Sequence, residues 1–406
     1  MRRLAVVFAD PLRLRIVTEL FMREMSPTGF FAEFGGGSVP RVDRHFKTLA
    51  EHGWLNLIRK ESGGRRRGGT EHFYRATELA IFDEETWSLL PYSIKVAFSW
   101  RIVEQFGERV REAIDAGTFD ARPERHFTWT PIVLDRAGWD RVLAALIILF
   151  ESVFEEQEDA KLRIAQSGEE LILTTVAFAG FESPTHDHIL GGEGNASSLV
   201  PPEKGFAESD NSLVPFTLRL AKVFADEICL KIVTELNLRE MSPTQFGKEF
   251  GGSPAAINRR FKMLEGLGWL RKVDEKTGGR RRGATEHFYR ATGPVIYDTD
   301  TWSEIPDSTK ATFSWRIFEQ FAERVQEAMA ADTFDARADR HLTWSLLMLD
   351  QLGWEKVLGE LMRLFDSLVK EQEDAKRRLA KSGEEPIRMT VALAAFESPK
   401  PATKEP

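Results

Sequence analysis

Residues 38–77 read SVPRVDRHFKTLAEHGWLNLIRKESGGRRRGGTEHFYRAT, and residues 253–292 read SPAAINRRFKMLEGLGWLRKVDEKTGGRRRGATEHFYRAT. The last fifteen residues of the two stretches differ at one position only, where Gly69 is replaced by Ala284. A match of this length within one chain indicates a duplicated structural unit. The fold is therefore predicted for one copy and then applied to the other.

The repeat extends outward from this stretch over nearly the whole chain. Phe8-Ala9-Asp10 returns at 224–226, and the tetrapeptide FESP at 181–184 returns at 396–399. The offset is 216 residues before the glycine turn at 35–37 and 215 residues after it. One residue has therefore been lost at this turn in the second copy.

Three helix starts precede the hairpin of the first copy. Asp10-Pro11 and Ser26-Pro27 each combine an N-cap residue with a proline at the first helical position, and Ser38 is a third N-cap. The third helix carries apolar residues at helical spacing and ends near Gly53. We expect three short helices, with a tight glycine turn between the second and the third.

A β-hairpin follows these helices. Residues 54–58 are apolar and strand-like, residues 62–69 form a basic turn, and residues 72–74 lie in the returning strand. Three helices followed by such a hairpin predict a winged helix-turn-helix.

The rest of each copy predicts long helices with a strand pair. In the first copy we expect a helix over 93–116, a strand over 125–134, a helix over 138–166 and a strand over 171–181. The longer helix would extend about 40 Å at 1.5 Å per residue. Its apolar stripe is too long for a small domain to bury alone, so we expect it to pack against its counterpart at 354–379.

The predicted fold class is α+β, mainly α, and the domain limits follow from the repeat. The segments are a winged helix-turn-helix at 1–90, a helical and strand dimerisation segment at 91–184, a linker at 185–215, a second winged helix-turn-helix at 216–305 and a second dimerisation segment at 306–399. The linker contains Gly-rich and Pro-rich runs without helical or strand periodicity.

The stretch from Ser38 to Leu55 resembles the recognition helix and its exit in the ArsR-like winged-helix regulators. In that family a serine-capped helix with an Arg-His-Leu type core runs into Gly-Leu and then into the wing. Ser253 to Leu270 fits the same pattern with Arg260 in place of the histidine. The resemblance covers about the first third of each copy and implies DNA-binding transcriptional regulation. Many members sense metals through cysteine thiolates, but this chain has one cysteine, so metal sensing is not carried over.

Charge is segregated along the chain in a way that supports this resemblance. The stretch 38–77 carries nine Lys or Arg and four Asp or Glu, and 253–292 carries ten and four. These local charges are +5 and +6, so the rest of a chain with net charge −8 carries −19. The cations gather where a nucleic-acid duplex would dock.

The candidate DNA-contacting residues lie on the outer face of each third helix and on each hairpin tip. Val42, Phe46 and Leu49 are expected to point inward, which leaves the neighbouring polar residues outward. The predicted DNA-binding residues are Ser38, Arg41, Arg44, His45, Thr48, Arg65, Arg66, Arg67, Ser253, Asn258, Arg259, Arg260, Arg280, Arg281 and Arg282. Arginine can bond guanine edges and asparagine can bond adenine edges in the major groove, while wing arginines can meet phosphates or the minor groove.

The two third helices differ where they should face bases. Arg41 aligns with Ala256, Asp43 with Asn258, and His45 with Arg260. We therefore predict an intramolecular pseudo-dimer that acts as a repressor at promoter DNA and reads an operator with two unequal half-sites about one helical turn apart.

Other interpretations of the same residues remain open at this stage. The hairpin arginines could form a solvated turn, Arg44 could pair with a carboxylate of its own domain, and the winged helices could be a protein-interaction scaffold without DNA binding. Trp100, Phe127, Trp129, Trp315 and Trp344 could line a pocket for a small organic effector, or they could be core residues.

No enzyme, cofactor, metal or membrane signature is found in the sequence. It has no P-loop, dinucleotide fingerprint, metalloprotease helix or nucleophile elbow, and His186-Asp187-His188 stands in the linker without further ligands. No apolar run approaches the length of a membrane span, and the single Cys229 suits a reducing compartment. We expect a cytoplasmic, non-enzymatic protein in which Cys229 is a passive residue at the edge of an apolar helix face.

Overall fold

The structure is a computed structural model, and it is mixed α+β and mainly helical, as predicted. It describes residues 2–62, 70–78, 80, 87, 89–184, 223, 226–277, 285–292, 302, 305–337 and 339–400. The predicted linker at 185–215, including His186-Asp187-His188, and the tips of both hairpins lie outside the described residues.

The two copies of the repeat contain matching elements. The first copy contains α1 (Arg2–Phe8), α2 (Pro11–Met22), α3 (Pro27–Phe34), α4 (Val39–Glu51), β1 (Leu55–Ser62), β2 (Thr70–Ala76), α6 (Tyr92–Asp115), β3 (His126–Leu134), α7 (Arg136–Ser167) and β4 (Ile172–Glu182). The second copy contains α10 (Glu227–Leu238), α11 (Pro243–Phe250), α12 (Pro254–Gly266), β5 (Leu270–Thr277), β6 (Thr285–Ala291), α14 (Asp307–Ala330), β7 (His341–Leu349), α15 (Gln351–Ser382) and β8 (Ile387–Glu397).

Each copy begins with a module of short helices and a β-hairpin. We call α1–α4 with β1–β2 the first module, and α10–α12 with β5–β6 the second module. The helix starts form as predicted, because Asp10 accepts a hydrogen bond from Leu12 N at 2.9 Å and Ser26 accepts one from Gly29 N at 3.0 Å. The short α1 was not predicted from the sequence, and its Phe8 is 2% exposed in the core of the first module.

The remaining strands form one antiparallel sheet in which the two copies alternate. The strand order is β3-β8-β4-β7, so each strand of the first copy pairs with at least one strand of the second. The segments 91–184 and 306–399 therefore share a single sheet. We call this sheet with α6, α7, α14 and α15 the central layer.

The pairing of the two middle strands reveals the symmetry of the molecule. Phe178 on β4 pairs with Leu393 on β8, and these two residues are counterparts in the repeat. An antiparallel pair of equivalent strands is related by a twofold axis perpendicular to the sheet. A pseudo-twofold axis therefore passes through the centre of the sheet at this pair.

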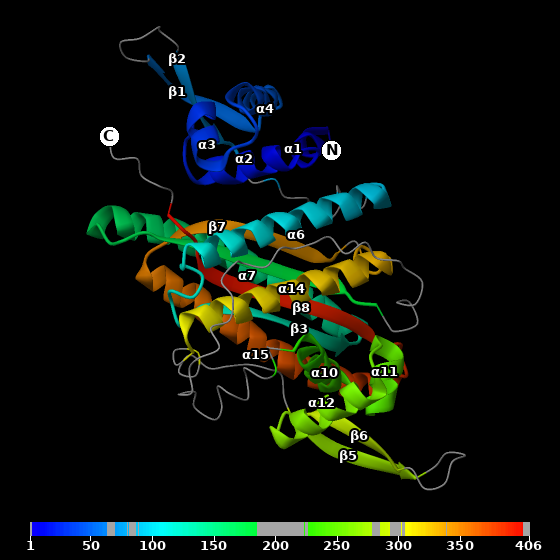
Figure 1. The fold of residues 1–406 in the computed structure, drawn as a ribbon. Coiled ribbons are helices and arrows are strands. Elements are labelled where there is room, and N and C mark those ends of the chain that lie inside the picture. Colours follow the sequence, from blue (N-terminus) through cyan, green and yellow to red (C-terminus); the bar gives the residue numbers. More distant parts are fainter. Residues whose placement is uncertain are drawn as a thin grey trace.

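Each face of the sheet is covered by a pair of helices, one from each copy. On β4, Val176 and Phe178 share a core with α7 and α15, whereas Ala179 and Phe181 share a core with α6 and α14. This is the alternation expected of a strand that is buried on both sides. The predicted packing of the long helix stripe against its counterpart occurs on the α7–α15 face, where both stripes also bury the sheet (Figure 1).

Polar contacts between the copies repeat the same symmetry on the α7–α15 face. Arg163 Nε donates to Asp350 at 2.6 Å, and its counterpart Arg378 donates to Asp135 at 2.6 Å. Each aspartate also caps the N-terminus of a long helix, so one carboxylate holds both its own helix and the other copy. The copies are thus joined by reciprocal charged hydrogen bonds as well as by apolar packing.

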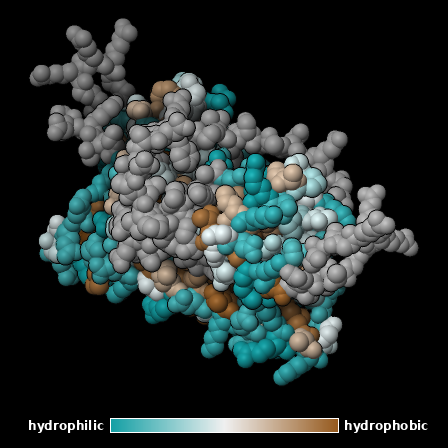
Figure 2. All heavy atoms as spheres, turned by 60° about the horizontal axis from the view of Figure 1, so that its bottom comes forward, coloured by the Kyte–Doolittle hydropathy of each residue, from teal (hydrophilic) through white to brown (hydrophobic). Residues whose placement is uncertain are grey.

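The two modules lie at opposite edges of the central layer, with their hairpins pointing away from each other (Figure 1). The first module contacts the edge strand β7, and the second module contacts the edge strand β3. Each module thus packs on a strand of the other copy. Figure 2 shows one side of the molecule, on which hydrophilic side chains predominate and hydrophobic ones are scattered.

Candidate nucleic-acid interface

The predicted third helix corresponds to α4 in the first module and to α12 in the second module. Each of these helices follows a glycine turn that no other residue fits easily. Gly36 has φ +109°, and a Cβ at this position would lie 3.0 Å from Val42 and 3.1 Å from Leu12. The turn leads into α4, where Ser38 adopts the N-cap conformation without a side-chain cap bond. In the second module Ser253 does accept a hydrogen bond, from Ala256 N at 3.2 Å.

The inner face of the third helix is fixed against the hairpin by aromatic contacts. Val42, Phe46 and Leu49 are fully buried, as predicted. The ring of Phe46 meets Phe30 on α3 and Tyr74 on β2 edge to face, with ring centroids 5.8 and 5.6 Å apart. Such contacts set the orientation of α4 relative to α3 and to the hairpin.

The second module repeats this aromatic arrangement. Phe261 on α12 meets Phe246 and Tyr289 edge to face at 5.8 and 5.5 Å. The outer face of each third helix is therefore presented by a rigid support.

Two of the cations on the outer face of α4 are exposed and have no carboxylate partner among the described residues. Arg41 and Arg44 are both exposed, and neither takes part in an ion pair with any residue that the structure describes. The alternative in which Arg44 pairs within its own module is therefore not observed. Thr48 is half-buried beside them, and Lys47 is occupied by Asp43 at 2.7 Å.

The outer face of α12 is similar in charge but different in residues. Asn258, Arg259 and Lys262 are exposed, and the described part of the chain offers no acidic partner to these two cations. Lys262 was not among the residues predicted from the sequence. Its signal was available there, because it lies three residues after Arg259 on the same helical face.

His45 does not lie on the outer face, which corrects the prediction from the sequence. Its side chain is 9% exposed, Arg13 Nε donates to its Nδ1 at 3.1 Å, and its Nε2 lies 3.8 Å from Asp10. Burial lowers the pKa of His45, and Asp10 opposes this shift. The buried face of α4 is wider than the Val42 stripe because α2 packs over it.

Arg260, the counterpart of His45, is also directed at its own module. Its Nε donates to Asp226 at 2.8 Å, and its side chain is 22% exposed. Asp226 is the N-cap of α10, so Arg260 joins α12 to α10. The predicted contact of Arg260 with DNA bases is therefore replaced by an intramodule ion pair.

Cys229 takes the place of Arg13 in the second module and is fully buried, not at the edge of the apolar face as predicted. The positive charge at this junction is thus on α2 in the first module, at Arg13, and on α12 in the second module, at Arg260. Burial raises the pKa of the Cys229 thiol to about 12.

The hairpins carry further cations next to the third helices. Lys60 and Arg75 on the first hairpin are exposed, whereas Arg59 pairs with Glu24 at 2.5 Å. Arg65, Arg66, Arg67, Arg280, Arg281 and Arg282 lie outside the described residues.

Buried ion pairs attach each module to the central layer. Glu19 on α2 is 3% exposed and pairs with Arg109 on α6, and its counterpart Glu235 on α10 is 1% exposed and pairs with Arg324 on α14. Arg388 on β8 also contacts Glu235 at 3.1 Å. These arginines lower the pKa of Glu235 to about 2 against the opposing effect of burial.

The aromatic residues predicted for an effector pocket separate in the structure. Trp344 borders a cavity of about 710 Å³ beside the first module, whereas its counterpart Trp129 borders one of about 10 Å³. Phe127 and Trp315 are 3% and 2% exposed in the core. Trp100 is half-buried and donates to Glu104 at 2.8 Å.

Searches for other kinds of site and for relatives gave negative results. Within the described ranges there is no group of three or more His, Cys, Asp or Glu side chains arranged to hold a metal ion. No described helix combines the length and the apolar character needed to cross a membrane. No protein-family model, curated protein or solved structure matches the chain.

Proposed function

We propose that this chain is a DNA-binding transcriptional regulator in which two winged helix-turn-helix modules act as an intramolecular pseudo-dimer. The observation that carries the proposal is the pair of exposed cationic faces on α4 and α12. In each module this helix carries exposed cations that have no acidic partner among the described residues. The helix is held rigidly beside a basic hairpin. A cation without an acidic neighbour is free to bind phosphate or a base edge.

The residues suggest a division of roles at the DNA. Arg41 and Arg44 on α4 would bond guanine edges or phosphates, and Asn258 and Arg259 on α12 would bond adenine and guanine edges. Because the two helices present different residues, we propose two unequal half-sites. Lys60 and Arg75 would neutralise phosphates next to the helix.

The distance between α4 and α12 sets the expected spacing of the half-sites. The edge strands β3 and β7 are about 14 Å apart at about 4.8 Å per strand. Two helices pack outward on each side, and about 10 Å for each of them gives about 54 Å between the axes of α4 and α12. One helical turn is about 35 Å. We therefore expect a spacing wider than the single turn predicted from the sequence, or a duplex that bends toward the modules.

We propose that the regulator acts by occupying promoter DNA and thus as a repressor. The described elements all belong to the two modules or to the central layer that joins them. This arrangement provides DNA contact and pairing of the modules, which is sufficient to block access of other proteins to the site.

The test is selection of bound sequences from random duplex DNA with the full chain, followed by anisotropy titration of the selected duplex. Arg41→Ala combined with Arg44→Ala should weaken binding by about tenfold or more, because each good arginine contact to a base contributes about 1–3 kcal/mol. Arg363→Ala combined with Lys370→Ala is the matched control, because it removes the same charge from exposed positions on α15.

If the control variant weakens binding as much as the α4 variant, the effect is one of net charge and the assignment of the interface is wrong. If no duplex is enriched and the full chain binds none, the protein-interaction scaffold becomes the better proposal.

A further inference from the structure

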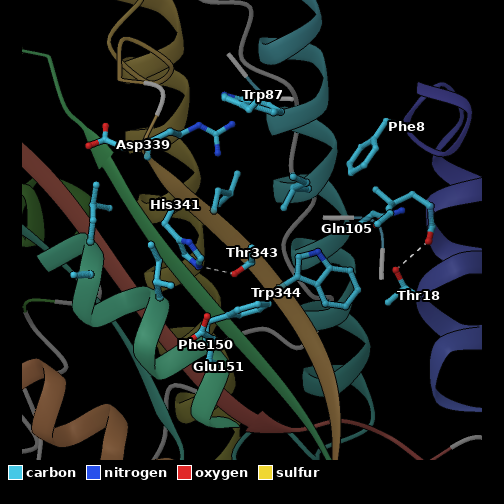
Figure 3. A pocket seen from close by; sticks show the side chains of 18 of the residues that line it. Phe8, Thr18, Trp87, Gln105, Phe150, Glu151, Asp339, His341, Thr343 and Trp344 are labelled. Atoms are coloured by element: carbon cyan, nitrogen blue, oxygen red, sulfur yellow. Dashed lines mark hydrogen bonds between the residues drawn. The ribbon is translucent and has the colours of Figure 1, made fainter. Parts of the chain in front are cut away.

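A cavity of about 710 Å³ lies between the first module and the central layer. The first module supplies one wall through Phe8 on α1 and through Leu14 and Thr18 on α2. The opposite wall comes from α6, α7 and the edge strand β7 (Figure 3). Cavities of this volume are typical of sites for organic molecules of drug size.

Aromatic rings from separate elements surround the cavity. Phe8, Trp87, Phe150 and Trp344 all border it, and Figure 3 shows them arranged around the open space. Aromatic faces bind apolar ring systems, and they also attract cations through the ring quadrupole. The guanidinium of Arg340 already lies 4.3 Å from the centre of the Trp87 ring, so the walls suit the apolar body of a ligand and the rim decides its charge.

One buried polar atom on the cavity wall lacks a partner. Gln105 on α6 is 6% exposed, and its Nε2 donates to Pro11 O at 3.0 Å. Its Oε1 accepts no hydrogen bond from any residue that the structure describes. This oxygen is enclosed by protein atoms, so the charged group of a ligand would be placed by the carboxylates of the cavity rim instead.

The charged side chains that border the cavity leave an excess of negative charge at its rim. Arg340 is already engaged by Asp335 at 2.6 Å and Ser99 at 2.5 Å. Asp140 and Asp339 share Arg136 as a partner, at 2.9 and 3.2 Å.

Glu151 is the remaining carboxylate of this rim. It is exposed and pairs with no cation among the described residues. His341, which also borders the cavity, stays neutral near pH 7, because burial and Arg340 lower its pKa to about 4.

We propose that this cavity binds an aromatic organic amine in its protonated form, with the ring system between the aromatic walls and the ammonium group directed to the carboxylate of Glu151 at the rim. The ligand would touch both the first module and the central layer, and it would therefore fix the orientation of α4. This regulatory consequence rests on the proposed DNA-binding function, whereas the binding site itself does not.

The pseudo-symmetric position in the second copy differs. Three wall residues are the same in both copies, because Thr18, Gln105 and Trp344 have Thr234, Gln320 and Trp129 as counterparts. Where the first site has Leu342, the second has the larger Phe127. We therefore expect the first site to bind the ligand more tightly than the corresponding position of the second copy, and each counterpart residue supplies a control for a substitution.

The experiment uses three fluorescent probes with one ring system and different charges. They are 9-(methylaminomethyl)anthracene, 9-anthracenemethanol and anthracene-9-carboxylate, titrated with the full chain without DNA. The amine should bind at least about tenfold more tightly than the carboxylate, a ratio equal to about 1.4 kcal/mol.

Matched variants locate the binding. Ala144→Trp places a large ring in the cavity from an exposed position on α7 and should weaken amine binding by at least about tenfold. Gly359→Trp makes the equivalent change on α15 and should change it by less than about twofold. Glu151→Gln should weaken amine binding more than its counterpart change, Asp366→Asn.

Absence of amine binding, equal binding of the carboxylate, or equal effects of Ala144→Trp and Gly359→Trp would each overturn the proposal. DNA binding of the unliganded chain is measured in parallel. If DNA binds and the amine does not, only the cavity proposal fails. If the amine binds as expected and DNA does not, the cavity stands and the proposed regulatory function fails.

Discussion

Two buried histidines predict a loss of stability in mild acid that can be worked out from the structure. His126 and His341 are counterparts on β3 and β7, and burial together with an adjacent arginine lowers the pKa of each to about 4. Each ring Nε2 lies 2.9 Å from a threonine hydroxyl two residues further on. The folded state therefore favours the neutral form of both rings.

The sign of the effect follows from the two pKa values. An unfolded histidine has a pKa near 6.5, so it binds a proton as the pH falls below 6.5, while the folded one stays neutral down to about pH 4. The unfolded state thus gains protons first, and the free energy of unfolding falls as the pH is lowered from 6.5 to 4. At pH 5 each histidine accounts for a loss of about 2 kcal/mol relative to pH 7.5.

The assay is urea unfolding of the full chain at pH 7.5 and pH 5. His126→Gln combined with His341→Gln should remove about 4 kcal/mol of the loss seen in the unsubstituted chain.

The loss of unfolding free energy between pH 7.5 and pH 5 is compared between the double variant and the unsubstituted chain, because other groups oppose the effect in both. Burial and neighbouring carboxylates raise the pKa of Glu323 to about 7, so its protonation stabilises the fold on acidification in every variant. His52→Gln, at an exposed position, is the control. The same pH dependence in the double variant and in the unsubstituted chain would refute the reasoning.

Three further predictions concern packing and buried charge. Cys229, with a thiol pKa of about 12, should react with Ellman's reagent only as fast as the second module opens; fast labelling of the native chain would show that the module is open. Gly107→Ala should lower the melting temperature, because its Cβ would lie 2.5 Å from Phe318, whereas Gly359→Ala in an open helical position should raise it; equal shifts would contradict the α6–α14 packing. Glu235→Gln should lower the free energy of unfolding by about 3–5 kcal/mol, because it leaves Arg324 and Arg388 without their buried partner. Glu327→Gln, in a more exposed ion pair, should lower the free energy of unfolding much less. Similar losses in the two variants would argue against a buried ion cluster.

The elements themselves were largely predictable because their signals are local. Proline after an N-cap residue marks the starts of α2 and α3, and period-3.6 apolar spacing marks α4 and α7. The strands were also found, because alternation or a continuous apolar run is visible in the residues themselves. The interleaving of the copies was not predicted, since the pattern of a strand such as β4 does not identify its partner.

The errors at the candidate interface have a physical cause of the same kind. The spacing of Val42, Phe46 and Leu49 gives the centre of a buried face but not its width. His45 lies inside that face because α2 places Arg13 and Asp10 against it, and this tertiary packing is not visible in the sequence. The cavity beside Trp344 depends in the same way on residues from separate elements of the fold, including Phe8 on α1 and Gln105 on α6.

The salt dependence of DNA affinity tests the central claim most directly. Titrating the full chain against its selected duplex at several salt concentrations should give a linear fall of log K with log salt, with a slope near −4.5 if Arg41, Arg44, Lys60, Arg75 and Lys262 each neutralise one phosphate. Arg41→Ala with Arg44→Ala should make this slope shallower by about 1.8. An affinity that does not change with salt, or a slope left unchanged by these substitutions, would contradict the account.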